Sequence, residues 1–160
     1  MRYLVLIICF VLSSCTFRVE TDFSKEALEE QFYTLDNKKI TFEKILEKYK
    51  GQKIVIDVWA SWCSDCLESL PTIKSIQRKH PNVVFLFLSI DYTLSDLQAG
   101  IKKYDVQGEH YLLPSGWDGN FADFLGLSWM PRYLVVDENG GIAVFNAVKA
   151  NDKRILSALE

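Results

Sequence analysis

The chain has 160 residues and a formal net charge of −3, and 49% of its residues are hydrophobic. This length and apolar content are typical of one globular domain that buries a sizeable core, and no repeat or low-complexity tract is present. The basic residues form no stripe along the sequence, so nucleic acid is not expected as a partner.

The first 14 residues are typical of an export signal. Arg2 supplies a positive charge, and residues 4–12 (LVLIICFVL) form an apolar run. That run is shorter than the roughly 20 apolar residues that a membrane-spanning helix needs. The segment ends in the letters LSSC, which resemble the lipobox of bacterial lipoproteins. The resemblance implies cleavage before Cys15 and a lipid on that cysteine.

We therefore expect a signal peptide over residues 1–14, a tether over 15–30 and one domain over 31–160. Loss of Arg2 would take the net charge from −3 to −4, because residues 1–14 contain no acidic residue. The expected location is the cell envelope, on the periplasmic side, with a lipid anchor at Cys15. An ordinary signal peptide with an incidental cysteine, or a short uncleaved anchor, remains an alternative.

Alternation of strand-like and helix-like segments predicts an α/β fold. A strand over 53–59 and a strand over 83–90 are joined by a helix, which requires a right-handed crossover between parallel strands. Pro71 is expected to kink that helix. The full prediction, in chain order, is a hairpin of 32–35 and 39–41, a helix over 42–49, the strand 53–59, a helix over 63–79, the strand 83–90, a helix capped by Ser95 and running to about 104, a short helix over 121–125 capped by Asn120, a hairpin of 132–137 and 141–147, and a helix over 152–159.

Cys63 and Cys66 are the only cysteines of the predicted domain, and two residues separate them at the strand-to-helix turn. The N-terminus of a helix stabilises a thiolate, and a thiolate with a second thiol in reach can break a foreign disulfide and then release it. The pair therefore predicts thiol–disulfide exchange. A structural zinc site needs four ligands, and neither His80 nor His110 has paired spacing with another ligand, so no metal or other cofactor is expected.

Several motifs at matching places resemble the thioredoxin superfamily. They are the WCSDC motif at 62–66, Asp57 on the preceding strand, Pro71 five residues after Cys66, and Met130-Pro131 before a strand. The N-terminal hairpin and the stretch 126–140 are similar to the ResA/TlpA branch, which consists of membrane-tethered, exported thiol–disulfide oxidoreductases related to the AhpC/TSA group. The resemblance covers about residues 32–160. It implies a thioredoxin-like fold with a mixed central sheet, flanking helices and an N-terminal β-hairpin extension.

The resemblance also implies residue roles. Cys63 would attack a substrate disulfide and Cys66 would resolve the mixed disulfide, so that the two form a redox-active disulfide. Asp57 would be a buried base that relays a proton for the resolving thiol, although a surface aspartate at a strand edge remains an alternative. Pro131 would be a cis-proline facing the cysteines, although a plain loop proline remains an alternative. The backbone of Met130 could then pair with an extended substrate chain.

The aromatic residues near the cysteines are expected to divide between surface and core. Trp62 is expected on the apolar substrate-binding rim and Trp59 in the core. Trp117 and Trp129 are unassigned, although Trp129 lies beside Met130 and could line a substrate groove.

The intervening pair Ser64-Asp65 departs from the family pattern, which more often has a proline before the second cysteine. Asp65 is an anion that opposes the stabilisation of a Cys63 thiolate by the helix dipole, and a less stabilised thiolate gives the couple a lower reduction potential. We therefore expect a reductant, near or below the roughly −270 mV of thioredoxin.

Two other functions remain open. A peroxide reductase of the AhpC/TSA type would have a threonine three residues before its cysteine, where this chain has Ala60, and an arginine near the thiolate. The second alternative is a non-catalytic binding or metal-delivery module, because a fold does not determine a function. For the leading hypothesis, the expected partners are disulfide-containing exported proteins and a membrane thiol-electron donor, and the protein is expected to be a monomer.

Overall fold

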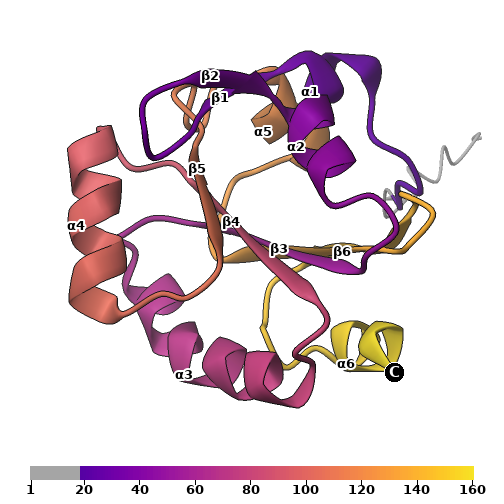
Figure 1. Cartoon of the computed structure of the whole chain (residues 1–160). Helices are drawn as coiled ribbons and strands as arrows, with labels where there is room; N and C mark the ends of the chain where they lie inside the picture. The colour runs from indigo at the N-terminus through magenta and orange to yellow at the C-terminus, as the bar shows by residue number, and fades with distance from the viewer. Residues whose placement is uncertain (1–18) are drawn as a thin grey trace, which may run out of the picture.

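The computed structural model of the chain describes residues 19–160 (Figure 1). The predicted signal peptide and the lipidation site Cys15 lie outside the described residues. Within residues 19–160, no helix is both long enough and apolar enough to cross a bilayer. The elements are α1 (Lys25–Glu29), β1 (Gln31–Tyr33), β2 (Lys39–Thr41), α2 (Phe42–Lys48), β3 (Ile54–Trp59), α3 (Ser64–Lys79), β4 (Val84–Ser89), α4 (Leu94–Tyr104), β5 (Glu109–Leu112), α5 (Asn120–Leu125), β6 (Arg132–Val136), β7 (Ile142–Ala147) and α6 (Lys153–Leu159).

One seven-stranded mixed sheet in the order β2-β1-β5-β4-β3-β6-β7 organises the molecule. Strands β3, β4 and β5 are parallel, whereas the β1–β2 and β6–β7 hairpins pair antiparallel within themselves and with their neighbours. Figure 1 shows α3 and α6 together on one side of the sheet and α1, α2 and α5 on the other. The predicted α/β architecture with an N-terminal hairpin at the sheet edge is confirmed.

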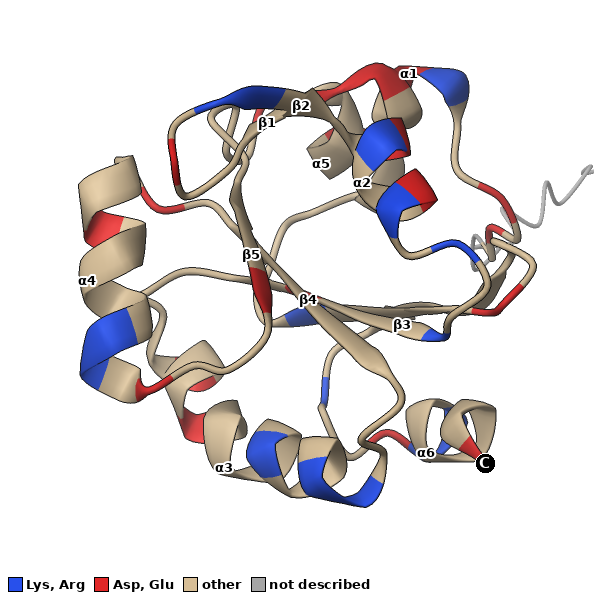
Figure 2. Cartoon of the chain, in the orientation of Figure 1, with Lys and Arg blue, Asp and Glu red and all other residues tan. Residues whose placement is uncertain are grey.

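The core lies around β3, because this central strand is covered on both faces. All six residues of β3 are buried, as its nearly continuous apolar sequence indicates. Helix α3 packs with Leu70, Ile73 and Ile76 buried, and it runs through Pro71 without ending. Figure 2 shows acidic residues at the start of α3 and basic residues at its end, which suits the helix dipole.

Residues before position 31 pack against the domain. Ala27 on α1 is fully buried, and α1 packs against α2 and α5. The ring of Phe23 meets that of Phe42 edge-on, with 4.9 Å between the ring centroids. Residues from Phe23 onward, which the sequence assigned to the tether, therefore contact the domain directly.

Two predicted helix caps were wrong. Helix α4 is capped by Thr93, whose Oγ1 accepts a hydrogen bond from the Asp96 N–H at 3.1 Å, and not by Ser95. Both residues carry a hydroxyl, so local sequence did not distinguish them. Asn120 is the first residue of α5 and not its cap; the cap is Gly119, which makes no side-chain hydrogen bond.

Strand β5 was not predicted. It pairs in parallel with β4 and antiparallel with β1, so its conformation depends on two partners distant in sequence. His110 on this strand is only 8% exposed. Its ring stacks on Phe87, and its Nε2 lies 3.0 Å from the Val106 carbonyl oxygen. Burial lowers the pKa of His110, while the Val106 carbonyl and the charge of Glu109 oppose this effect.

The folded state is therefore expected to lose stability in mild acid through His110. A histidine with a lowered pKa binds its proton more weakly when folded, so its contribution is lost as the pH falls below the unfolded-state value of about 6.5. The loss can reach about 1.4 kcal/mol per pH unit. Urea unfolding at pH 7 and pH 5 should show a smaller decline for His110→Gln than for the wild type. Parallel declines would contradict the prediction.

Candidate active site

Cys63 and Cys66 form a disulfide at the start of α3, just after the turn that follows β3. Cys63 is the N-cap residue of α3, and its Sγ accepts a hydrogen bond from the Cys66 N–H at 3.2 Å. Cys63 is 8% exposed and Cys66 is 1% exposed. Of the two cysteines, Cys63 is therefore the one that an incoming molecule can reach first.

The turn before Cys63 is held by a buried carboxylate that sequence reasoning missed. Asp91 is 3% exposed, and it accepts hydrogen bonds from the N–H and the Oγ of Ser61 at 3.0 and 2.7 Å, and from the Oγ of Ser89 at 2.7 Å. On the other side, α4 presents Gly100, where a Cβ atom would collide with the Ser61 side chain. A polar residue just after a buried parallel strand was the available signal.

Asp57 lies in the middle of β3 and is 3% exposed, which excludes the alternative of a surface aspartate. Its Oδ1 has no hydrogen-bond partner. Burial raises the pKa of Asp57 well above its ordinary value. A carboxyl group of this kind can accept a proton near neutral pH, as a general base must. The proton-transfer role itself stays a prediction.

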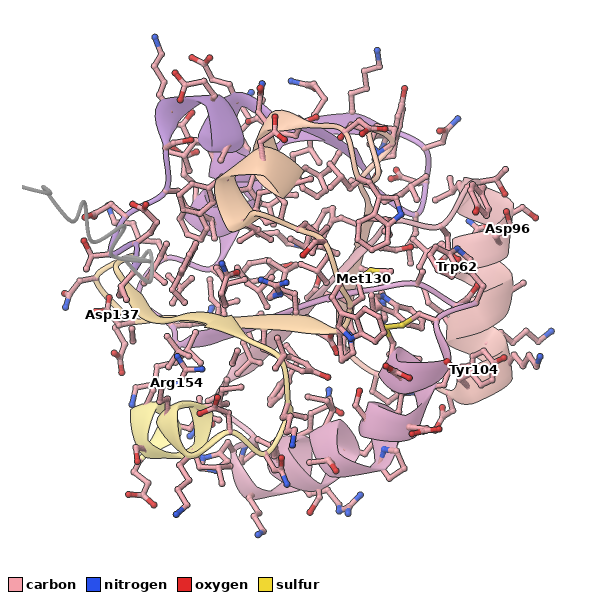
Figure 3. All side chains as sticks on the ribbon, turned by 180° about the vertical axis from the view of Figure 1, so that it is seen from behind. Trp62, Asp96, Tyr104, Met130, Asp137 and Arg154 are labelled. Carbon is pink, nitrogen blue, oxygen red and sulfur yellow. A yellow bond between two sulfur atoms is a disulfide. The ribbon has the colours of Figure 1, made fainter. Side chains whose placement is uncertain are left out.

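The Met130–Pro131 peptide bond is cis. Met130, Cys63, Ser64 and Asp65 line a hollow together with Ser128. Three exposed aromatic side chains complete its wall: Trp62, Trp117 and Trp129. Figure 3 shows Trp62 and Met130 beside the disulfide. The structure thus brings the predicted residues Cys63, Trp62 and Met130 to one surface.

The tryptophans divide as expected between core and surface. Trp59 is 1% exposed and packs edge-on against Phe87. Trp62 is 45% exposed and stacks on Tyr92, with 5.9 Å between ring centroids. Tyr92 follows Asp91 directly, so one short segment supports both the turn before Cys63 and the aromatic ring of Trp62.

Among residues 19–160, no group of three or more histidine, cysteine, aspartate or glutamate side chains is placed to hold a metal ion. His80 is the C-cap residue of α3, and His110 lies on β5 against Phe87. The Cys63–Cys66 disulfide is itself a reactive group at this site, because a thiolate can attack it.

A family model for Redoxin matches residues 24–159. The chain belongs to the Redoxin family. Among curated relatives, the thiol–disulfide oxidoreductase ResA of Bacillus thuringiensis subsp. konkukian is 25% identical over 125 residues, which cover 76% of this chain and 67% of ResA. The thioredoxin-like protein YneN of Bacillus subtilis is 26% identical over 101 residues, and the match spans 61% of this chain but only 57% of YneN.

Solved structures confirm the thioredoxin-like fold of this Redoxin-family chain. The thioredoxin domain of a thiol–disulfide oxidoreductase from Bacteroides vulgatus superposes with a TM-score of 0.66 at 16% identity, and the match covers 85% of this chain and 96% of that domain. At this identity the similarity shows the fold alone. Together with the Redoxin match and ResA, it confirms the predicted place in the thioredoxin superfamily, among ResA-like members.

Proposed function

We propose that the chain is a thiol–disulfide oxidoreductase that reduces disulfides of exported proteins. The observation that carries this proposal is the Cys63–Cys66 disulfide at the N-terminus of α3, with a buried Asp57 of raised pKa on the preceding strand. Cys63, the more exposed of the two cysteines, would supply the attacking thiolate, Cys66 the resolving thiol and Asp57 a group that can accept its proton.

In the proposed reaction, the reduced protein transfers two electrons to its substrate. The Cys63 thiolate attacks one sulfur of the substrate disulfide, and the other substrate sulfur leaves as a thiolate. Cys66 then gives its proton to Asp57 and attacks the Cys63 sulfur of the mixed disulfide. The second substrate sulfur leaves as a thiolate, which can take the proton from Asp57, and the Cys63–Cys66 disulfide remains.

The hollow beside Cys63 would receive the substrate chain. In this proposal the backbone of Met130, held before the cis bond to Pro131, pairs with an extended segment of the substrate. Trp62, Trp117 and Trp129 would contact apolar side chains flanking the substrate cysteine. The proposed setting is the periplasmic side of the envelope, with a monomer anchored by a lipid on Cys15 and supplied by a membrane thiol-electron donor. The sequence of residues 1–15 supports export and the lipid anchor, whereas the electron donor comes from the resemblance to the ResA/TlpA branch.

Peroxide reduction is less well supported. Ala60 occupies the position of the threonine that this chemistry uses, and it is fully buried. Arg132 lies close in the chain to the cis-proline, but it is buried and its Nη2 donates to the Trp129 carbonyl at 3.5 Å. It does not line the hollow at Cys63.

The reduction potential of the Cys63–Cys66 couple tests the proposal. Equilibration of the soluble domain in graded dithiothreitol buffers should show a reversible two-electron transition near or below about −250 mV. Asp65→Asn should raise the potential by about 5–20 mV, because it removes an anion from the first turn of α3. A value between about −120 and −180 mV would instead indicate an oxidant or isomerase. Absence of a transition would favour a binding or metal-delivery module.

A further inference from the structure

A chain of two hydrogen bonds joins strand β6 to the resolving cysteine. The hydroxyl of Tyr133 donates to Ser69 Oγ at 2.8 Å, and Ser69 Oγ donates to the backbone carbonyl of Cys66 at 2.6 Å. Tyr133 is fully buried and lies two residues after Pro131. The contact therefore ties the first turn of α3 to the strand that begins at the cis-proline.

Tyr133 also lies directly opposite Asp57 in the sheet. The two residues are paired between antiparallel strands β6 and β3, so their side chains leave the sheet on the same face. Since Tyr133 contacts Ser69 of α3, that face is the one which α3 covers. Burial first, and the charge of Asp57 second, raise the pKa of Tyr133, so its hydroxyl stays protonated and available as a donor.

Pro71 weakens the backbone hydrogen bonding of α3 next to its first turn. Pro71 has no N–H, so the hydrogen bond that would normally reach the Leu67 carbonyl is missing one residue after Cys66. The first turn of α3 is therefore tied less firmly to the rest of its own helix. A side-chain donor at the Cys66 carbonyl, anchored on a buried strand, replaces part of that restraint.

We propose that Ser69 and Tyr133 are positioning residues for the resolving step, and that they hold Cys66 in line with the Cys63 sulfur and within reach of Asp57. The inference rests on the proposed function. In that step the Cys66 proton passes to Asp57, the Cys66 sulfur bonds to Cys63, and the bond from Cys63 to the substrate sulfur breaks. A small displacement of a reacting atom lowers the reaction rate strongly. Loss of these hydrogen bonds should therefore slow the resolving step by Cys66 and not the first attack by Cys63.

The two steps can be separated with dithiobis-nitrobenzoate, an aromatic disulfide whose thiol product is coloured. The fully reduced protein is mixed rapidly with one equivalent of this reagent. Attack by Cys63 releases the first coloured thiol, and resolution by Cys66 releases the second. Ser69→Ala should slow the second phase by about 3- to 10-fold, the effect expected from losing one hydrogen bond, and leave the first phase unchanged.

Three further variants make the test specific. Ser69→Thr keeps the hydroxyl and should restore the second phase, whereas Tyr133→Phe removes only the outer bond and should slow it less than Ser69→Ala does. Ser95→Ala, at an exposed position on α4, is the matched control.

The outcomes distinguish the inference from the proposed function. Equal second-phase rates in the wild type and Ser69→Ala would overturn the inference, and so would equal slowing of both phases, which indicates general disruption. A wild type that releases only the first thiol would overturn the proposed function itself.

Discussion

A Cys66→Ser variant is expected to accumulate as a mixed disulfide and to lose multiple turnover. Cys66 is almost fully buried in the first turn of α3, and its sulfur is the group bonded to Cys63 in the oxidised protein. Serine has nearly the same shape, but its hydroxyl cannot displace a thiolate from Cys63. Each reduced variant molecule should therefore retain one substrate molecule on Cys63.

This result can be measured with a peptide disulfide of known mass. Intact mass spectrometry should detect one covalent adduct per chain, removable by dithiothreitol, and reductase activity should fall to the background rate. Cys63→Ser is the control and should form much less adduct, because Cys66 is 1% exposed. Adducts of equal yield on both variants would contradict the assignment of Cys63 as the attacking residue.

Asp57→Asn is expected to make the oxidised protein more stable and less active. For an acid whose pKa is raised by folding, the stabilising contribution is complete below the unfolded-state value of about 4 and is lost as the pH rises to the folded-state pKa. The loss over that interval is about 1.4 kcal/mol per pH unit. Asparagine does not titrate, so the variant should be more stable than the wild type at pH 8 and should lack this decline.

The same substitution removes the proposed proton acceptor of Cys66. At pH 7 the second phase of coloured-thiol release should slow by about a hundredfold, the lower range of general-base contributions, whereas the first phase should keep its rate. Asp123→Asn, at an exposed position on α5, serves as the control for charge alone. An Asp57→Asn variant with wild-type resolution would show that another group accepts the proton.

Features encoded over short distances were predictable from the sequence. The apolar run of β3, the two cysteines at the start of α3 and the X-Pro bond before β6 are each visible within a few residues. The cis state of Pro131 agrees with what the resemblance to the thioredoxin superfamily implied.

The features that were missed depend on contacts between distant residues. Asp91 meets Ser61 across a sequence separation of 30, and Tyr133 meets Ser69 across a separation of 64. Strand β5 is four residues long and pairs with β4 and β1, which lie far from it in the sequence. No local periodicity carries such information, since it resides in how the strands are ordered in the sheet.

The close approach of α4 to the turn before Cys63 has a consequence for which sequences this fold can use. Because Gly100 leaves no room for even a methyl group beside Ser61, any larger residue at this position must move either the helix or the turn. Position 100 therefore couples the packing of α4 to the conformation of the turn before the cysteine pair. Because the collision is with the Ser61 Cβ, Gly100→Ala should destabilise the protein less when it is combined with Ser61→Gly than when it is made alone.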